Sequence, residues 1–459
     1  MKLLQLLQKK ESQSIPASKI MKTVYIESLG CPRNFADSEF LSGLIEKNGY
    51  FIVSSPEDAR FIIVNTCGFI EDAINESLDY IFELSKFKKN GKCECLIVAG
   101  CLAQRFKKEL AIELEEADFF VGTGALSDIP LILSGFKEKK EKCFFPDPLN
   151  QPLFNSKSPR IITTFPFAYL KIAEGCARRC SFCIIPELKG PLRSRGVKDI
   201  VVEAQNLIDS GIKEIVLISQ ETTDYGRDLK SGENLSLVLR EISSLSKDVR
   251  IRFMYGHPLS ISDELIETTA MHKNICSYFD IPVQHASKKL LQKMNRGYDL
   301  KYLKSLFEKI RKNVEDAVLR TTIITGFPGE TDDDFKILSD FIDEIKFNHA
   351  GVFTYSEMED LISFPLENKV DFETAEQRRI VLMEKQAVIS QEKNSAYLGK
   401  TLSVLIEGRD SEDFYVGRTM FQAPEVDGIT YVDAKGLKTG DIVDVYITDA
   451  FDYDLAGNG

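Results

Sequence analysis

Two long stretches of the chain alternate short apolar runs with helical patterns, and this alternation limits the possible fold more than any other feature. In the first stretch the apolar runs are residues 23–28, 61–65, 95–99 and 118–121. Helical patterns near 37–48, 71–87 and 105–115 separate them. Such alternation is typical of a parallel sheet that is covered by helices on both faces. We therefore predict a doubly wound, flavodoxin-like α/β domain over residues 22–136.

The second alternating stretch begins after residue 160. Its six apolar runs are 167–173, 214–219, 250–255, 278–283, 318–325 and 351–355, with helical patterns between them. Six strand-helix units predict an open (β/α)6 barrel over residues 161–395, related to the eightfold barrel. Residues 137–160, between the two stretches, contain Lys, Glu and four prolines but few periodic apolar positions. We interpret them as a linker.

The pattern changes again near the end of the chain, after a helical stretch at 373–397. Short runs at 401–407, 414–418, 429–432 and 441–448 are separated by turn residues, which predicts a small antiparallel, OB-like β-barrel over residues 396–459. At the other end, residues 1–21 form an N-terminal extension, whose leucines stop at Lys9 and Lys10 before a signal-peptide core could form. No apolar run approaches the roughly 18 residues that a membrane span needs, so we expect a cytoplasmic protein.

Three cysteines, Cys176, Cys180 and Cys183, follow the first apolar run of the second stretch. The chain has ten cysteines and no export signal, and in a reducing cytosol clustered thiols bind metal more often than they form disulfides. A structural zinc ion would need a fourth ligand. Three thiolates can instead bind three irons of a 4Fe-4S cube and leave the fourth iron open. We predict such a cluster, with unligated surface thiols as the alternative.

This CxxxCxxC spacing, with aromatic Phe182 before the last cysteine, resembles the signature of radical S-adenosylmethionine (SAM) enzymes. The resemblance implies that the open iron binds SAM and that the reduced cluster cleaves SAM to methionine and a 5'-deoxyadenosyl radical. It also implies SAM contacts at the ends of the barrel strands. The candidates are Phe182, Ser219, Gln220, Glu221, Gln284 with its neighbour His285, Arg320 and Gly326. Around Gly326, residues 325–330 could equally be a plain strand-to-helix turn.

Three more cysteines each follow a predicted strand of the first domain, namely Cys31, Cys67 and Cys101. The carboxyl ends of parallel strands share one edge of an open sheet, where ligands usually bind, so we expect these thiols to converge. A second cluster with three protein ligands would use that convergence, and three buried structural cysteines are the alternative. We interpret the other four cysteines as ordinary thiols: Cys93, Cys95, Cys143 and Cys276.

With both sets of cysteines, a radical SAM barrel and a small terminal barrel, the chain from about residue 22 resembles the methylthiotransferase family. The resemblance implies two 4Fe-4S clusters. An auxiliary cluster on Cys31, Cys67 and Cys101 would carry the sulfur that is inserted, and the cluster on the other three cysteines would generate the radical. The terminal barrel would be a TRAM domain. One SAM would donate the methyl group and another would supply the radical, and the enzyme would need an external electron donor and a sulfur donor.

Two segments resemble the branch of this family that methylthiolates the β-carbon of an aspartate in ribosomal protein S12 of the small subunit. Residues 28–34 read SLGCPRN, whereas the branch that modifies an adenosine in tRNA usually has Gln-Met-Asn after the cysteine. Residues 417–428 read GRTMFQAPEVDG, which is similar to the ribosomal-protein branch.

The charge of the chain favours the same substrate. The net charge is -12, and residues 396–459 carry five Lys and Arg against twelve Asp and Glu. A barrel that holds RNA should be basic, whereas a surface for a basic ribosomal protein should be acidic. A solubilising face is the plainer interpretation. We expect S12 as the partner, and neither a nucleic acid substrate nor a membrane. The alternatives are a tRNA adenosine methylthiotransferase and a non-catalytic iron-sulfur protein that binds or transfers electrons.

Overall fold

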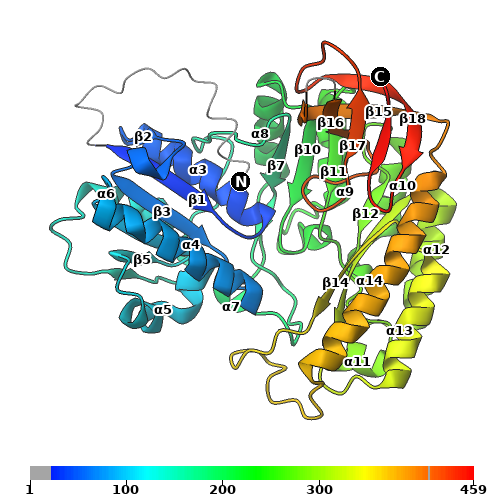
Figure 1. The fold of residues 1–459 in the computed structure, drawn as a ribbon, viewed down its shortest axis with the longest axis horizontal. Helices are drawn as coiled ribbons and strands as arrows, with labels where there is room; N and C mark the ends of the chain where they lie inside the picture. The colour runs from blue at the N-terminus through cyan, green and yellow to red at the C-terminus, as the bar shows by residue number, and fades with distance from the viewer. Residues whose placement is uncertain (1–21, 412–413) are drawn as a thin grey trace. The chain divides into compact units, whose positions relative to one another are not determined.

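A computed structural model of the chain describes residues 22–411 and 414–459, so the predicted N-terminal extension lies outside the described residues. The chain forms two compact units, which Figure 1 colours in chain order. Of the described residues, the first unit contains 22–164 together with 173–178 and 183–195. The second contains 165–172, 179–182, 196–411 and 414–459.

The first unit is built on a six-stranded parallel sheet in the order β2-β1-β3-β4-β5-β6. Its strands are β1 (Thr23–Ser28), β2 (Phe51–Ile52), β3 (Phe61–Thr66), β4 (Cys95–Gly100), β5 (Phe119–Val121) and β6 (Cys143–Phe144). The order of the first five strands is the one found in flavodoxin-like folds. This part of the fold prediction is confirmed, although two-residue β2 and β6 were not predicted.

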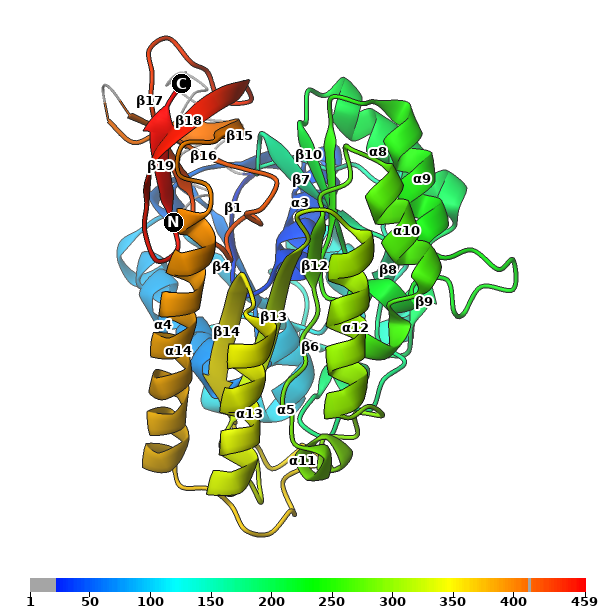
Figure 2. The same cartoon turned by 90° about the vertical axis from the view of Figure 1, so that its right-hand side faces the viewer.

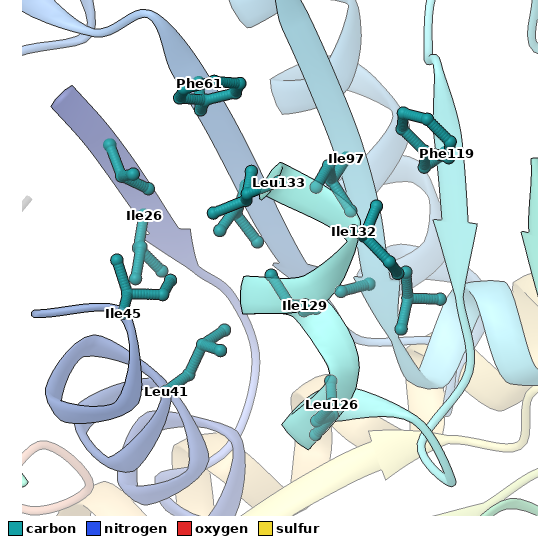
Figure 3. Packing of buried hydrophobic residues seen from close by; sticks show 14 of the residues in the cluster. Ile26, Leu41, Ile45, Phe61, Ile97, Phe119, Leu126, Ile129, Ile132 and Leu133 are labelled. Carbon is teal, nitrogen blue, oxygen red and sulfur yellow. The ribbon is translucent and has the colours of Figure 1, made fainter. Parts of the chain in front are cut away.

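Helices cover both faces of this sheet because the strands are apolar on both faces. The helices are α3 (Pro32–Lys47), α4 (Glu71–Asn90), α5 (Cys101–Glu113) and α6 (Ile129–Ser134), with short 3-10 turns η1 (Pro56–Asp58), η2 (Leu126–Asp128) and η3 (Pro148–Asn150). Figure 3 shows one face, where Ile26 and Ile97 of the strands pack against Leu41 of α3 and Ile132 of α6. The alternate strand residues, such as Ile62 and Val98, pack against α4 and α5 on the other face. Every strand side chain of β3 and β4 is thereby buried.

The segment 137–160, predicted as a linker, belongs to the first unit. Within it β6 pairs with β5 and adds the sixth strand of the sheet. Phe154 stacks on Phe40 with ring centroids 4.7 Å apart, and the Arg160 guanidinium donates to the buried Glu39 carboxylate at 2.6 Å. The segment is therefore packed against the first unit. Its many prolines and short elements leave no periodic apolar pattern in the sequence.

The second unit contains an open barrel of six parallel strands, as predicted. The strands are β7 (Phe167–Lys171), β10 (Glu214–Ile218), β11 (Arg250–Phe253), β12 (Tyr278–Asp280), β13 (Val318–Thr325) and β14 (His349–Thr354). They pair as β11-β10-β7 and as β12-β13-β14, and a single bridge between Ile251 and Ile275 joins the two halves. The short hairpin of β8 (Ala173–Glu174) and β9 (Arg193–Ser194) belongs to the first unit, as does α7 (Ile185–Lys189).

Helices follow the barrel strands, and Figure 2 shows α12, α13 and α14 alongside β12, β13 and β14. The helices are α8 (Val197–Asp209), α9 (Leu235–Leu245), α10 (Asp263–Met271), α11 (Lys288–Lys293), α12 (Leu300–Asn313), α13 (Asp332–Ile345) and α14 (Phe372–Ser395), with 3-10 turns η4 (Thr222–Asp224) and η5 (Pro258–Ser260). Among the described residues, no helix is both long and apolar enough to cross a membrane.

The end of the chain forms a closed five-stranded barrel in the order β15-β16-β17-β19-β18. Its strands are β15 (Thr401–Arg409), β16 (Phe414–Arg418), β17 (Thr430–Asp433), β18 (Ile442–Ala450) and β19 (Leu455–Asn458). The sequence predicts four of these strands. The fifth, β19, runs antiparallel to β18 but parallel to β17 and closes the barrel, so one pair departs from the predicted antiparallel arrangement.

Buried charges join this terminal barrel to the (β/α)6 barrel within the second unit. Arg418 of β16 and Arg252 of β11 both contact the Glu214 carboxylate, at 3.0 and 2.7 Å. These three side chains are at most 1% exposed. The Arg250 guanidinium also donates to the carbonyl oxygens of Ser403 and Arg418. Burial would raise the pKa of Glu214, but Arg418 and Arg252 lower it to about 2. This carboxylate therefore stays ionised.

Candidate functional site

The three cysteines of the first unit stand at the carboxyl edge of its sheet, as predicted. Cys31 is the N-cap of α3 after β1, Cys67 follows β3, and Cys101 is the first residue of α5 after β4. Cys67 and Cys101 are buried and Cys31 is partly buried. A Cβ on Gly30, the neighbour of Cys31, would lie 2.9 Å from the Cys67 sulfur, and the charges of Cys67 and Cys31 add to burial in raising the pKa of Cys101. The structure therefore brings this triad together.

Two glycines in left-handed conformations allow this approach. Gly30, with φ +85°, precedes Cys31, and a Cβ on it would lie 2.9 Å from the Cys67 sulfur. Gly100, with φ +95°, precedes Cys101, and a Cβ there would lie 2.5 Å from the Asn65 side-chain oxygen. Because only glycine adopts such angles without strain and brings no side chain, both loops can turn tightly into the site.

Buried amides and a hydroxyl connect the loops that carry the triad. The Asn34 amide donates to the carbonyl oxygens of Leu29 and Thr66, at 3.1 and 2.9 Å. The Asn65 amide donates to the Asn34 carbonyl oxygen, and the Thr66 hydroxyl to the Ala99 carbonyl oxygen. These bonds join the ends of β1, β3 and β4, so the cysteine positions are fixed by the sheet itself.

The charges around the triad differ from one thiol to the next. Burial raises the pKa of Cys67, and it raises the pKa of Cys101 to about 12. Burial also opposes ionisation of Cys31, but Arg33, whose Nε lies 3.4 Å from the sulfur, outweighs it with smaller contributions from Asn34 and Lys189, and the pKa is lowered. Iron ligation requires thiolates and displaces their protons. The lowered pKa makes Cys31 the thiol of this triad that ionises most readily.

Within residues 22–411 and 414–459, no three His, Cys, Asp or Glu side chains are arranged to hold one metal ion. In an iron-sulfur cube each thiolate binds a different iron, so a cube needs one thiol from each of several neighbouring loops. The three cysteines at this edge therefore fit a 4Fe-4S cluster with one open iron.

The second triad lies in the loop between β8 and α7. The Cys176 N–H donates to the Gly190 carbonyl oxygen at 3.1 Å, and the Arg178 N–H lies 3.4 Å from the Cys176 sulfur. The Cys180 sulfur is buried and lies 3.4 Å from Nη1 of Arg296. Cys183 is partly buried. Amide and guanidinium donors aimed at sulfur stabilise thiolates, which suits these residues as cluster ligands.

Most predicted SAM contacts stand at the carboxyl ends of barrel strands. Ser219, Gln220 and Glu221 directly follow β10, and Gly326 directly follows β13. Phe182 packs against the apolar cluster of Leu290, Met294 and Phe327. A Cβ on Gly326 would lie 2.3 Å from that of Ala375. Helix packing thus already requires a glycine at this position.

Gln284 shows the clearest sign of a ligand site. It has φ +67°, which is rare for a residue with a side chain. Its backbone N–H donates to the Thr322 carbonyl oxygen, and its carbonyl oxygen accepts from the Ile324 N–H, both in β13. Its side-chain oxygen is buried and has no hydrogen-bond partner among the described residues. A buried acceptor without a donor is costly, so a ligand that donates a hydrogen bond fits here. Strained, unsatisfied residues of this kind cluster at binding sites.

Arg320 and His285 are engaged by protein groups. Arg320 is the third residue of β13, toward the amino end, and pairs with Asp280 at 2.9 Å and with Asp427 at 3.4 Å. The buried His285 accepts from the Ser287 N–H, and its other ring nitrogen lies 3.7 Å from the Glu330 carboxylate. The structure does not bring Arg320 to the strand ends where Gln284 and Gly326 lie.

Sequence reasoning missed the charged partners of both triads. Arg296 lies beside Cys180, and Lys189 is buried near Cys31 and Cys101. Only tertiary contacts reveal them, because Arg296 is 116 positions from Cys180. The one local signal is that Lys189 closes α7, shortly after Cys183.

Three segments of the chain match known families. Residues 23–122 match the family described as "Uncharacterized protein family UPF0004", residues 170–342 match the radical SAM superfamily, and residues 398–458 match the TRAM domain.

Among solved structures, the radical SAM methyltransferase TsrM of Kitasatospora setae covers 72% of this chain and 72% of its own, with a TM-score of 0.55 and 14% identity. OxsB, a cobalamin-dependent radical SAM enzyme, covers 80% of this chain and 61% of its own, with a TM-score of 0.52 and 14% identity. These two likenesses concern the fold alone. Fold and families together define a radical SAM enzyme with a TRAM domain.

Full-length relatives narrow this class. The ribosomal protein uS12 methylthiotransferase RimO of Clostridioides difficile is 46% identical over 95% of this chain and 99% of its own. The proteins of the same name from Syntrophus aciditrophicus and Aquifex aeolicus are 45% and 44% identical, over 94% of this chain and 97% and 96% of their own. The chain belongs to this RimO family of methylthiotransferases. The predicted family, the enzyme class and the cofactors, SAM and two 4Fe-4S clusters, are confirmed.

Proposed function

We propose that this enzyme replaces a hydrogen on the β-carbon of an aspartate in ribosomal protein uS12 (S12) with a methylthio group. The observation that carries the proposal is membership of the RimO family over about the whole chain, at 46% identity to a relative named for this reaction. The two cysteine triads support it, because radical formation and sulfur delivery need separate centres. Cytoplasmic location follows from the proposed substrate.

In this proposal Cys31, Cys67 and Cys101 hold the auxiliary cluster, and Cys176, Cys180 and Cys183 hold the cluster that binds SAM. When bound, the clusters and SAM supply a radical that removes the hydrogen and the sulfur that replaces it. The protein positions these groups and excludes water.

For the SAM site we propose Phe182, Ser219, Gln220, Glu221, Gln284 and Gly326. Gln284 would accept a hydrogen bond from the cofactor through its buried side-chain oxygen. We place Arg320 outside this site, because it lies near the amino end of β13, where it pairs with Asp280 and Asp427.

The acidic terminal barrel supports a basic protein as the substrate. Asp444 and Asp449 of β18 and Asp452 beyond it are exposed, and this part of the chain carries few compensating cations. Carboxylates attract the Lys-rich and Arg-rich surface of a ribosomal protein and repel RNA phosphates. The reaction also needs an external electron donor and a sulfur donor as partners.

The direct test is anaerobic turnover of the reconstituted enzyme with SAM, a reductant and either uS12 or tRNA. Intact-mass measurement should find a methylthio group on uS12, on one aspartate. A mass gain on tRNA alone would establish the adenosine-modifying alternative. Formation of 5'-deoxyadenosine separates both from a simple electron carrier, which would hold clusters without cleaving SAM. Cys101→Ala should still cleave SAM but leave uS12 unmodified.

A further inference from the structure

A buried lysine lies beside the auxiliary triad and has no role in the function proposed above. Lys189 ends α7, and its side chain is 6% exposed. Its ammonium donates to the Asp37 carboxylate at 3.2 Å, and the Asp37 side chain is 2% exposed. Lysine is almost never fully buried unless it is paired. A buried Lys-Asp pair is also costly to form, so its presence at this place calls for a reason.

The pair belongs to the triad by position. Asp37 lies on α3, the helix that Cys31 caps, so Asp37 and the Cys31 backbone move as one element. Burial would lower the pKa of Lys189, but nearby negative groups outweigh it and raise the pKa. The largest of these contributions comes from Glu174, followed by Asp37, Cys101 and Cys31. The ammonium therefore keeps its proton within the electrostatic reach of two cluster thiolates.

The backbone of α7 fixes this ammonium from two sides. The Leu188 carbonyl oxygen accepts a hydrogen bond from the Thr123 hydroxyl, in the loop after β5. The Gly190 carbonyl oxygen accepts from the Cys176 N–H. The residues before and after Lys189 are thus both anchored. A lysine side chain normally moves freely and is costly to order, but here packing has already ordered it.

The charge that such an ammonium would meet is negative. Three thiolates carry more negative charge than an oxidised cube carries positive charge, and a sulfur anion on the open iron would add to this negative excess. In a buried site such charge is costly unless a cation compensates it. Arg33 contacts the Cys31 sulfur, and the charge of the buried Lys189 lowers the pKa of both Cys31 and Cys101 against the effect of burial.

We propose that Lys189, held by Asp37, is a positioning residue that compensates the charge of the auxiliary cluster and so favours an anionic sulfur ligand on its open iron. The inference rests on the proposed assignment of Cys31, Cys67 and Cys101 to that cluster. In this view the positive charge of Lys189 attracts an anionic sulfur ligand to the open iron. We also predict that a buried positive charge, rather than the lysine side chain as such, is required.

The test uses the full chain with Cys176→Ala, Cys180→Ala and Cys183→Ala, in which only the auxiliary cluster can form. Lys189→Met, Lys189→Arg and the exposed-site control Lys47→Met are made in this background. Lys47 lies on the same helix as Asp37, so its replacement removes the same charge from the surface. Iron and sulfide are counted, the midpoint potential is measured by an EPR-monitored redox titration, and methanethiolate binding is titrated.

Lys189→Met should retain the cluster, shift its potential to a lower value and weaken methanethiolate binding roughly tenfold, because a nearby positive charge is lost. Lys189→Arg and Lys47→Met should match the parent. An unchanged potential and affinity in Lys189→Met would overturn the proposal, as would Lys189→Arg behaving like Lys189→Met. If the parent triple variant itself binds no cluster, the assignment of the triad fails instead.

Lys189→Met removes a positive charge from the buried Asp37 and Glu174 and could prevent folding for that reason alone. Lys189→Met with Asp37→Asn removes the hydrogen-bonded pair as a unit and relieves the Asp37 part of this penalty. The double variant should load iron and still bind methanethiolate more weakly than Asp37→Asn alone. Equal affinities in these two chains would make Lys189 only a structural partner of Asp37 and overturn the proposal.

Discussion

Gly30 shows how a single backbone position controls the auxiliary site. We expect Gly30→Ala to lose the cluster on Cys31, Cys67 and Cys101, because the new methyl group would lie 2.9 Å from the Cys67 sulfur at φ +85°. Iron and sulfide per chain should fall by about half. Cleavage of SAM to 5'-deoxyadenosine should persist, since the other cluster has separate ligands.

Gly49→Ala is the matched control for this change. Gly49 has φ +82°, but a Cβ there would have only the end of Lys22 nearby, at 3.6 Å. It carries the same backbone strain of about 1 kcal/mol without any contact to a cysteine. If Gly49→Ala lost as much iron as Gly30→Ala, general destabilisation would explain both results.

Arg418 illustrates the opposite case, a residue whose charge holds two parts of the second unit together. Arg418→Met should lower the free energy of unfolding by about 3–5 kcal/mol, because it leaves Glu214 and Glu407 with less compensation in a buried place. Arg409→Met, at an exposed position of β15, should change stability little. Denaturant titration of the two variants checks the difference, and equal midpoints would contradict this view of the buried cluster.

At the scale of elements, long apolar strands were predictable and very short ones were not. The expected ranges 23–28 and 318–325 coincide with β1 and β13, because a run of buried side chains leaves a clear pattern. β2, β6 and β9 have two residues each, which is too few to show any period. Helix α5 begins at Cys101 rather than at the expected 105, since the turn at Gly100 depends on its neighbours in space.

Helix α13 gives a pH-dependent prediction, because its N-terminus is closed by a capping box between Thr331 and Asp334. Burial would raise the pKa of Asp334, but hydrogen bonds from Ser287 and Thr331 lower it from 3.8 to about 2. A lowered pKa means that this stabilisation is complete above about pH 4 and is lost as the pH falls toward 2.

Asp334→Asn should therefore lower the free energy of unfolding by about 1 kcal/mol near pH 6. The difference in this free energy between variant and parent should shrink as the pH is lowered toward 3. Urea titrations of the cluster-free chain at several pH values measure this. Asp333→Asn, one residue earlier and exposed, should show a smaller difference. If the difference in free energy of unfolding between Asp334→Asn and the parent grew as the pH fell, the ionised Asp334 carboxylate would not be the stabilising group.

At the scale of the whole molecule, the placement of the candidate cysteines was predictable because it depends on local spacing and strand order. Cys176, Cys180 and Cys183 are close in sequence, and the other triad follows from strand order in a parallel sheet. Lys189 and Asp37, by contrast, are 152 positions apart, and Tyr169 donates to Glu425 across 256 positions. Pairs of this kind arise only when the chain has folded, and no pattern along the sequence encodes them.

The choice of substrate is also a property of the whole molecule, because it depends on the summed charge of an exposed face. Asp444→Lys, Asp449→Lys and Asp452→Lys together should raise KM for uS12 roughly tenfold and leave kcat near the parent value, since surface charges steer association more than chemistry. Added salt should reduce the difference, because it screens exposed charges. Steady-state methylthiolation at two ionic strengths measures both effects.

The matched control places three charge reversals on the outside of the (β/α)6 barrel, at exposed positions of α10, of α12 and of the turn after α12: Glu267→Lys, Glu308→Lys and Glu315→Lys. This variant has the same net charge as the first, so it separates a local surface from the total charge of the chain. If the two variants raise KM equally, attraction to the whole molecule is sufficient. If only the first does, the terminal barrel is where the basic protein binds, and its acidity is a feature of recognition rather than of solubility.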